Sequence, residues 1–123
     1  MINYHEISEF QRDFKNLLKR FRTLEKDFEI MKKYTIETHH IKNVPSSAIF
    51  KIEGFCGEKY TSNKIKKFAC MSLSGKGSNS KIRVIYVYEE KEKKVTFIEI
   101  YFKGDKANED RDRLKNFIDA LII

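Results

Sequence analysis

The feature that most constrains the fold is the segment "KIRVIYVYEEKEKKVTFIEIYFKGDK", residues 81–106, in which two apolar runs flank a short charged connector. Both runs are rich in β-branched and aromatic residues, which predicts a β-hairpin. Because the apolar character is continuous rather than alternating, we expect central strands that are covered on both faces. Cations stand at the outer ends of the hairpin, Lys81 and Arg83 before it and Lys103 and Lys106 after it. A hairpin that only fills a core does not need them.

Helical patterns occupy the first third of the chain. In "SEFQRDFKNLLKRF", residues 8–21, Ser8 and Gln11 fit a capping box, and the apolar residues recur at helical spacing. Thr23 is the expected cap of a second helix, in which Leu24, Phe28, Met31 and Tyr34 share one face. The short break between the two predicts a helical hairpin, which ends before Pro45.

The remaining elements complete an α+β pattern. We expect strands within residues 47–55 and 64–73, a glycine- and serine-rich turn at 74–80, and a short first strand at residues 2–7. An apolar stripe in residues 114–122 predicts a last helix, with Asn108 as its cap. The predicted fold is therefore an N-terminal helical hairpin packed on a mainly antiparallel sheet of about four strands, with a C-terminal helix. Residues 1–123 are expected to form a single domain.

The positive charge is concentrated in one stretch. Residues 59–88 contain seven Lys and Arg and no Asp or Glu, although the whole chain has 18 acidic residues and a net charge of +7. Such a block attracts polyanions or an acidic protein partner. The alternative interpretation is a solvated lysine-rich surface that keeps the chain soluble.

Several functional classes are excluded by composition. Two cysteines without a CxxC spacing and three histidines cannot assemble a zinc site of normal spacing, so we expect no metal. No apolar run reaches the length of a membrane span. The N-terminal sequence "MINYHEISEF" lacks the order of a signal peptide, so we expect a cytoplasmic chain without membrane contact.

Two segments carry a resemblance to a known family. "GKGSNSKIRVIYVY" is similar to a glycine-serine turn that leads into an arginine-initiated strand, and "FIEIYFKGDKANED" is similar to a strand that ends in a basic motif before the final helix. With the opening helix, this order resembles the RelE/ParE superfamily of toxins, and most closely its RelE/HigB-like branch. The resemblance implies a small basic endoribonuclease that cuts mRNA, commonly on the ribosome, without metal or cofactor. It also implies a cognate antitoxin as partner.

RNA cleavage by a 2′-hydroxyl requires contacts to phosphate, compensation of developing charge, and proton transfer. The resemblance places Arg83 at the family's active-site arginine, and its planar fork suits two phosphate oxygens. The alternative role for Arg83 is an ion pair with a carboxylate such as Glu99. Lys103 and Lys106 match the basic group at the end of the next strand. If Arg83 lies opposite Tyr101, then Arg83, Tyr101 and Lys103 share one face, whereas a slip of one residue separates them.

The strand predicted at 64–73 adds further lysines. Relatives use a lysine or arginine there, and we favour Lys67, with Lys66 as the alternative. Relatives often carry a Tyr or His near the terminal segment, but residues 107–123 contain neither, so Tyr101 is the candidate substitute. The expected catalytic residues are Arg83, Lys103, Lys67 and Tyr101, and the expected RNA-binding residues are Lys64, Lys66, Lys76, Lys81 and Lys106.

Two other functions remain open. One is a binding module of the same fold, either catalytically silent or directed against gyrase as in ParE-like relatives. The other is an unrelated basic α+β domain that binds nucleic acid.

Overall fold

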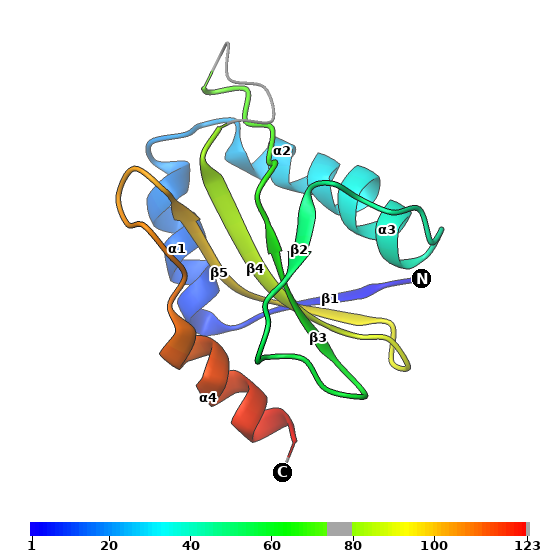
Figure 1. Ribbon diagram of the computed structural model, residues 1–123. Helices are drawn as coiled ribbons and strands as arrows, with labels where there is room; N and C mark the ends of the chain where they lie inside the picture. Colours follow the sequence, from blue (N-terminus) through cyan, green and yellow to red (C-terminus); the bar gives the residue numbers. More distant parts are fainter. Residues whose placement is uncertain (74–79, 123) are drawn as a thin grey trace.

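The computed structural model describes residues 1–73 and 80–122. Its centre is a five-stranded mixed sheet in the order β1-β5-β4-β3-β2 (Figure 1). The long hairpin of β4 (Ile82–Glu89) and β5 (Lys94–Phe102) is central, as the sequence predicts, and most of its strand residues are buried. β3 (Thr61–Ile65) and β2 (Ile49–Lys51) extend the sheet with antiparallel pairing. On the other side, β1 (Asn3–Glu6) pairs with β5 in parallel.

The two faces of the sheet are covered by different helices. The helical hairpin of α1 (Ser8–Leu18) and α2 (Leu24–Met31) lies on one face and packs on a large apolar cluster that includes Phe10, Phe28 and Phe97. α4 (Arg111–Leu121) lies on the opposite face, where Leu114 and Ile118 meet Ile85. Figure 1 shows α1 behind the sheet and α4 in front of it. Apolar side chains on both faces explain why the two hairpin strands lack an alternating pattern.

The second helix changes its pitch where the sequence predicts a continuous stripe. After α2 the chain forms a π-helical turn, η1 (Lys32–Ile36), followed by α3 (Glu37–His40). The wider turn moves the buried position from Tyr34 to Ile36, so that Tyr34 is 65% exposed and Ile36 is completely buried. The expectation that Tyr34 shares the core face is therefore wrong.

The strand predicted at 64–73 is also shifted. It begins at Thr61 and ends at Ile65. Just beyond it the N–H of Lys66 still donates to the carbonyl oxygen of Ala48 (2.9 Å), and Phe68 forms an isolated β-bridge. Further along, the N–H of Met71 donates to Asp27 Oδ2 (3.0 Å) and the N–H of Ser72 donates to Thr23 Oγ1 (2.8 Å). The last part of the predicted strand is therefore bound to α2 and its N-cap residue and is not a strand.

The residues that cap the helices also differ from the predicted ones. Thr23 occupies the N-cap position of α2, but its hydroxyl contacts Asp27 and Ser72 and does not cap the helix backbone. Ser8 is already helical and its hydroxyl donates to Glu9. α4 is capped by Asp110, whose side chain accepts from the N–H of Arg113 (3.0 Å), and not by Asn108.

Within the described part of the chain, the helices are all too short or too polar to cross a bilayer.

The cap of α4 gives a direct test of this fold. Asp110→Ala removes the acceptor for the first turn and should lower the free energy of unfolding by about 1 kcal/mol. Asn108→Ala, which leaves that acceptor in place, should change it by less than about 0.5 kcal/mol. Urea denaturation of both variants measures the difference. An equal loss of unfolding free energy in the two variants would contradict Asp110 as the cap of α4.

Candidate nucleic-acid interface

The candidate interface lies at the end of the sheet where β3 ends, β4 begins and β5 ends. The register pairs Arg83 with Tyr101, and it pairs Ile85 with both Lys64 and Glu99. Ile85 belongs to the apolar cluster under α4, and residues two apart or directly opposite share a face of a sheet. Arg83, Tyr101 and Lys64 are therefore brought together on the α4 face, in the register that the sequence leaves as one of two alternatives.

A β-bulge shapes this end of the sheet. Ile85 pairs with Glu99 and the next residue, Tyr86, pairs with Phe97, so Ile98 is the extra residue on β5. Ile98 packs in the cluster under α4, and Glu99, opposite Ile85, faces the same side. The bulge thus turns a carboxylate that strand alternation would aim at the helical hairpin toward the α4 face.

Glu99 is buried and fully engaged. Its side chain is 3% exposed, and it forms an ion pair with Lys106 and accepts from the N–H of Asp110 (2.7 Å). Glu99 is thus the partner of Lys106, and Arg83 forms no ion pair within residues 1–73 and 80–122. The alternative role for Arg83, pairing with Glu99, is not the arrangement observed.

A second carboxylate neutralises Lys64. Glu109 Oε1 lies 2.7 Å from Lys64 Nζ, and the exposed fractions of the two side chains are 4% and 15%. Burial would raise the pKa of Glu109, but the Lys64 hydrogen bond and the positive field outweigh it, so that pKa lies below its ordinary value. For Lys64, burial opposes the charged form, yet the contacts with Glu109 and Tyr101 raise its pKa. Both groups are charged at neutral pH.

Tyr101 lies between these charged groups. It is 5% exposed, and its hydroxyl has no hydrogen-bond partner within the described residues. Burial raises the pKa of Tyr101, an effect that the neighbouring Lys64 ammonium opposes. Lys106 Nζ lies 5.3 Å from the centre of the tyrosine ring, in a cation–π arrangement. Tyr101 is therefore a protonated phenol beside two ammonium groups.

Arg83 reaches toward the surface around these buried charges. Its Nη1 donates to the carbonyl oxygen of Lys66 (2.9 Å), which fixes the guanidinium at the end of β3. Since Lys66 and Lys67 follow the last residue of β3, strand alternation does not set the faces on which their side chains lie. Lys67 Nζ contacts Ser47 Oγ (3.3 Å), and Lys66 Nζ lies 4.6 Å from the centre of the Phe50 ring.

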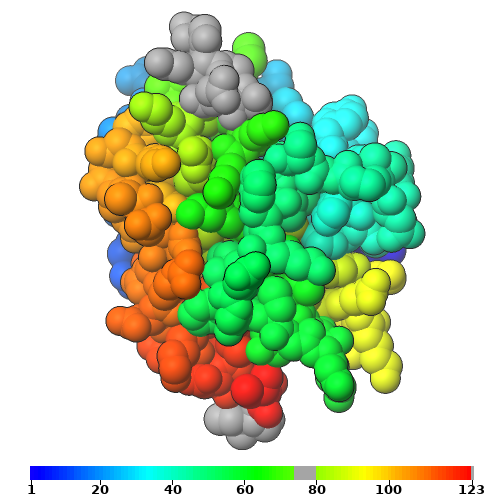
Figure 2. Space-filling view, in the orientation of Figure 1, coloured from blue at the N-terminus to red at the C-terminus, as the bar shows by residue number. Residues whose placement is uncertain are grey.

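The exposed cations form a rim around Arg83. Lys103 follows β5, and its N–H donates to the carbonyl oxygen of Lys81 (2.8 Å), so these two residues meet across the hairpin. Figure 2 shows the orange loop after β5 beside the yellow-green start of β4 and the green residues that follow β3. Lys76 lies outside the described residues. The rim consists of Lys66, Lys67, Lys81 and Lys103, all of them exposed.

Sequence reasoning named Glu99 only as a possible partner of Arg83, and it missed Glu109. Glu99 carried a signal, because an acidic residue inside the apolar run "FIEIYF" needs a partner. Glu109 carried no such signal in the sequence, since its contact with Lys64 depends on how the loop after β5 packs against β3. His39 and His40 lie elsewhere, and within the described residues no three His, Cys, Asp or Glu side chains gather as metal ligands.

The Lys64–Glu109 pair should contribute to stability in a pH-dependent way. Glu109→Gln leaves the buried Lys64 ammonium without its counterion and should lower the free energy of unfolding by about 2 kcal/mol at pH 7. Because the folded pKa of Glu109 is lowered, this contribution is complete above its unfolded pKa of about 4.3 and is lost as the pH falls through the folded value. The loss caused by the substitution should therefore shrink toward zero in strong acid.

Urea denaturation of wild type and variant between pH 2 and pH 7 measures this dependence. Glu92→Gln, an exposed site in the hairpin turn, is the matched control and should have almost no effect. A Glu109→Gln loss that is small at pH 7, or that is unchanged in acid, would contradict the ion pair.

Comparison with known proteins shows the fold but not a sequence family. No protein-family model matches the chain, and no curated protein matches it in sequence. A chain in the crystal structure of the archaeal RelE–RelB complex from Pyrococcus horikoshii OT3 is similar in structure, with a TM-score of 0.50 and 14% identity over 84% of this chain and 96% of that chain. The protein therefore has a RelE-like α+β fold.

Proposed function

We propose that this chain is a RelE-type toxin, a single-domain endoribonuclease that cleaves mRNA at the ribosome without a metal ion or cofactor. The observation that carries the proposal is the convergence of Arg83, Lys64 and Tyr101 at one end of the sheet, inside a rim of exposed lysines. The RelE-like fold supports it.

The proposed chemistry is attack of a ribose 2′-hydroxyl on the adjacent phosphate. Arg83 binds two oxygens of the reacting phosphate, because its guanidinium offers parallel donors at the edge of the sheet. The rim lysines hold the flanking phosphates, which aligns the attacking and leaving oxygens. Arg83 and the ammonium of Lys64 offset the negative charge that develops on the oxygens of the pentavalent phosphorus in the transition state.

Proton transfer falls to the buried groups of the interface. Tyr101 and Lys64 are protonated at neutral pH, so either can donate to the leaving 5′-oxygen. Lys64 can donate this proton only if the substrate displaces Glu109 as its hydrogen-bond partner. Glu109 then keeps its ion pair with Arg111 (Nε to Oε2, 3.1 Å), and its released Oε1 can accept the proton of the 2′-hydroxyl, although its low pKa makes it a weak base.

The proposal includes partners and a location. The similar structure is that of a RelE–RelB complex, which supports a cognate antitoxin for this chain. We place the protein in the cytoplasm, where mRNA and ribosomes are its targets, without membrane contact.

A second candidate is a binding module of the same fold, catalytically silent or directed against gyrase. The observation in its favour is that Lys64 and Lys106 are already neutralised by buried carboxylates. Growth arrest with rapid loss of translation supports the nuclease, whereas arrest with DNA damage signalling supports gyrase as the target.

Arg83→Ala combined with Lys103→Ala should remove toxicity while the protein stays folded. Loss of the guanidinium alone should slow cleavage by about 100-fold, because a donor aimed at the transition state is removed. Growth after induction, and cleavage of mRNA on purified ribosomes, measure the effect. Arg22→Ala with Lys26→Ala, two exposed cations on the other face, is the matched control and should stay toxic. Full toxicity of the folded Arg83–Lys103 variant would remove these residues from the mechanism.

RNA binding should also weaken steeply with salt. If Arg83 and the four rim lysines each neutralise one phosphate, the slope of log K against log salt should be about −3.5 for single-stranded RNA. The Arg83→Ala variant should have a slope smaller in magnitude by about 0.7. Fluorescence anisotropy with a labelled oligonucleotide between about 50 and 300 mM salt measures both slopes, and a flat response would argue against phosphate contacts.

A further inference from the structure

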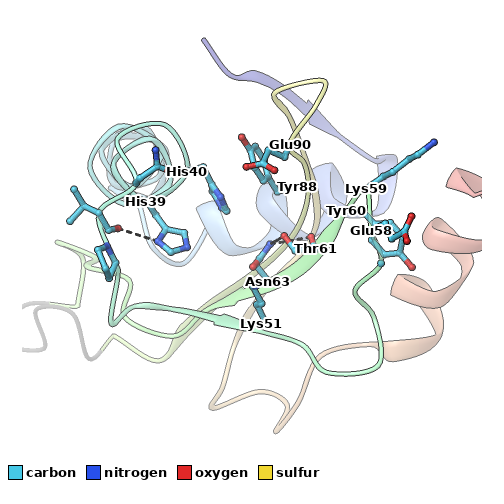
Figure 3. A pocket seen from close by; sticks show the side chains of 14 residues that line it. His39, His40, Lys51, Glu58, Lys59, Tyr60, Thr61, Asn63, Tyr88 and Glu90 are labelled. Carbon is cyan, nitrogen blue, oxygen red and sulfur yellow. Dashed lines mark hydrogen bonds between the residues drawn. The ribbon is translucent and has the colours of Figure 1, made fainter.

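A cavity of about 410 Å³ lies far from Arg83, at the opposite end of β3 and β4. Thr61 and Tyr88, which line the cavity, are paired at that end, whereas Ile65 and Val84 are paired beside Arg83. Figure 3 shows the two histidines of α3 on one side of the cavity and the strand residues on the other. Its volume lies within the range of small-ligand pockets, roughly 300–1,000 Å³. Its lining residues include His39, His40, Lys51, Asn63 and Tyr88.

Lys51 and Asn63 line the cavity and belong to a row of side chains across three strands. Lys51 of β2 pairs with Asn63 of β3, which pairs with Tyr86 of β4, so the three side chains share a face. The amide nitrogen of Asn63 donates to the carbonyl oxygen and to Oγ1 of Thr61 (3.1 and 3.0 Å), which fixes the carboxamide. Both N–H groups of Asn63 are thereby used, and its amide oxygen is the group left to accept from a ligand.

The wall of the cavity is rigid. His40 Nε2 is 2.7 Å from the hydroxyl of Tyr86, and the His40 ring stacks on Tyr88 with 4.0 Å between ring centres. His39 Nδ1 lies 3.2 Å from the carbonyl oxygen of Val44, which anchors the chain that leaves α3. These contacts hold α3 against the sheet, so the cavity is formed before any ligand arrives.

Tyr88 has an unsatisfied group at this cavity. The residue is 5% exposed, and its hydroxyl has no hydrogen-bond partner within residues 1–73 and 80–122. A buried hydroxyl without a partner destabilises a protein, so such groups are uncommon and each needs a physical explanation. A ligand in the cavity that accepts from or donates to Tyr88 would satisfy it.

Charged side chains of both signs line the cavity: the lysines Lys51 and Lys59 and the carboxylates Glu58 and Glu90. Burial and the charges of His39 and Lys51 lower the pKa of His40 to about 4, so the imidazole is neutral at pH 7. Lys51 forms no ion pair in the described part of the chain. A ligand that matches this set is anionic at one end and has a hydrogen-bonding edge at the other. Inorganic phosphate would reach Lys51 but leave Tyr88 and Asn63 without partners.

We propose that this cavity binds a nucleoside monophosphate unit, with its phosphate at Lys51 and the edge of its base at Tyr88 and Asn63. The unit is either a free nucleotide or the terminal nucleotide of an RNA chain, which present the same chemistry. Because the cavity and Arg83 lie at opposite ends of the sheet and on opposite faces, this site is separate from the proposed nuclease site.

The test is isothermal titration of the full chain with the four nucleoside 5′-monophosphates, with a 5′-phosphorylated trinucleotide and with inorganic phosphate. At least one nucleotide should bind with a Kd below about 1 mM, and at least about tenfold more tightly than phosphate. Tighter binding of the mononucleotide identifies a free nucleotide as the ligand. Tighter binding of the trinucleotide identifies an RNA end only where Lys51→Met weakens it, because the trinucleotide can also bind the phosphate-binding surface around Arg83. Trinucleotide binding that Lys51→Met leaves unchanged counts against the site.

Two variants separate this site from a general attraction to a basic protein. Tyr88→Phe should weaken nucleotide binding about fivefold without lowering the melting temperature, because it removes a hydroxyl that has no partner in the free protein. Lys51→Met should weaken binding about tenfold. The matched controls Tyr34→Phe and Lys26→Met, both exposed residues outside the cavity, should leave the affinity unchanged.

Arg83→Ala should also bind nucleotide normally, so failure of the proposed nuclease and failure of this site can be told apart. The proposal is overturned if no nucleotide binds at about 1 mM, or if Tyr88→Phe and Lys51→Met bind as tightly as the wild type.

Discussion

The position of the C-terminal helix depends on one buried carboxylate, Glu99. A buried carboxylate is tolerated only when it is paired and hydrogen-bonded. The bulge at Ile98 turns Glu99 toward α4, where it accepts from the N–H of Asp110 and pairs with Lys106. That contact fixes the residue at which α4 begins, and it places Glu109 beside Lys64. Without the bulge, the loop after β5 would lose its contacts with Glu99, and the Glu99–Lys106 pair would not form.

The same arrangement sets the charge balance at the candidate interface. The pKa values of Lys64 and Tyr101 are each raised, and Lys64 and Lys106 each form an ion pair with a buried carboxylate, so the interior of the interface has little net charge in the free protein. The positive field available to a polyanion comes from Arg83 and the exposed rim around it. In this account the surface cations bind the RNA, and the buried groups transfer protons. Lys64 leaves Glu109 only when a phosphate of the RNA reaches it.

Some parts of the fold and of the candidate interface could be predicted from the sequence, and others could not. The central hairpin was predictable because its residues have high β-propensity, and α4 was predictable because its apolar residues recur at helical spacing. The end of β3 was not, because the backbone N–H groups of Met71 and Ser72, in the last part of the predicted strand, bind Asp27 and Thr23, which lie 44 and 49 residues away in the chain. The cations around Arg83 were recognised, and Glu99 was considered as a partner of Arg83, but its pairing with Lys106 was not predicted, since a β-bulge leaves no local signature. The second cavity depends on the register of Lys51, Asn63 and Tyr86 across three strands, which no local pattern specifies.

The measurement that tests the central claim most directly is a map of mRNA 5′ ends within minutes of inducing the chain in a bacterial host. The account predicts new ends at coding positions in the wild-type strain and their absence in an Arg83→Ala strain that makes the same amount of folded protein. New ends in both strains would show that Arg83 is not part of the cleavage site. Normal growth without new ends, from soluble folded protein, would contradict the nuclease and favour a binding module of RelE-like fold.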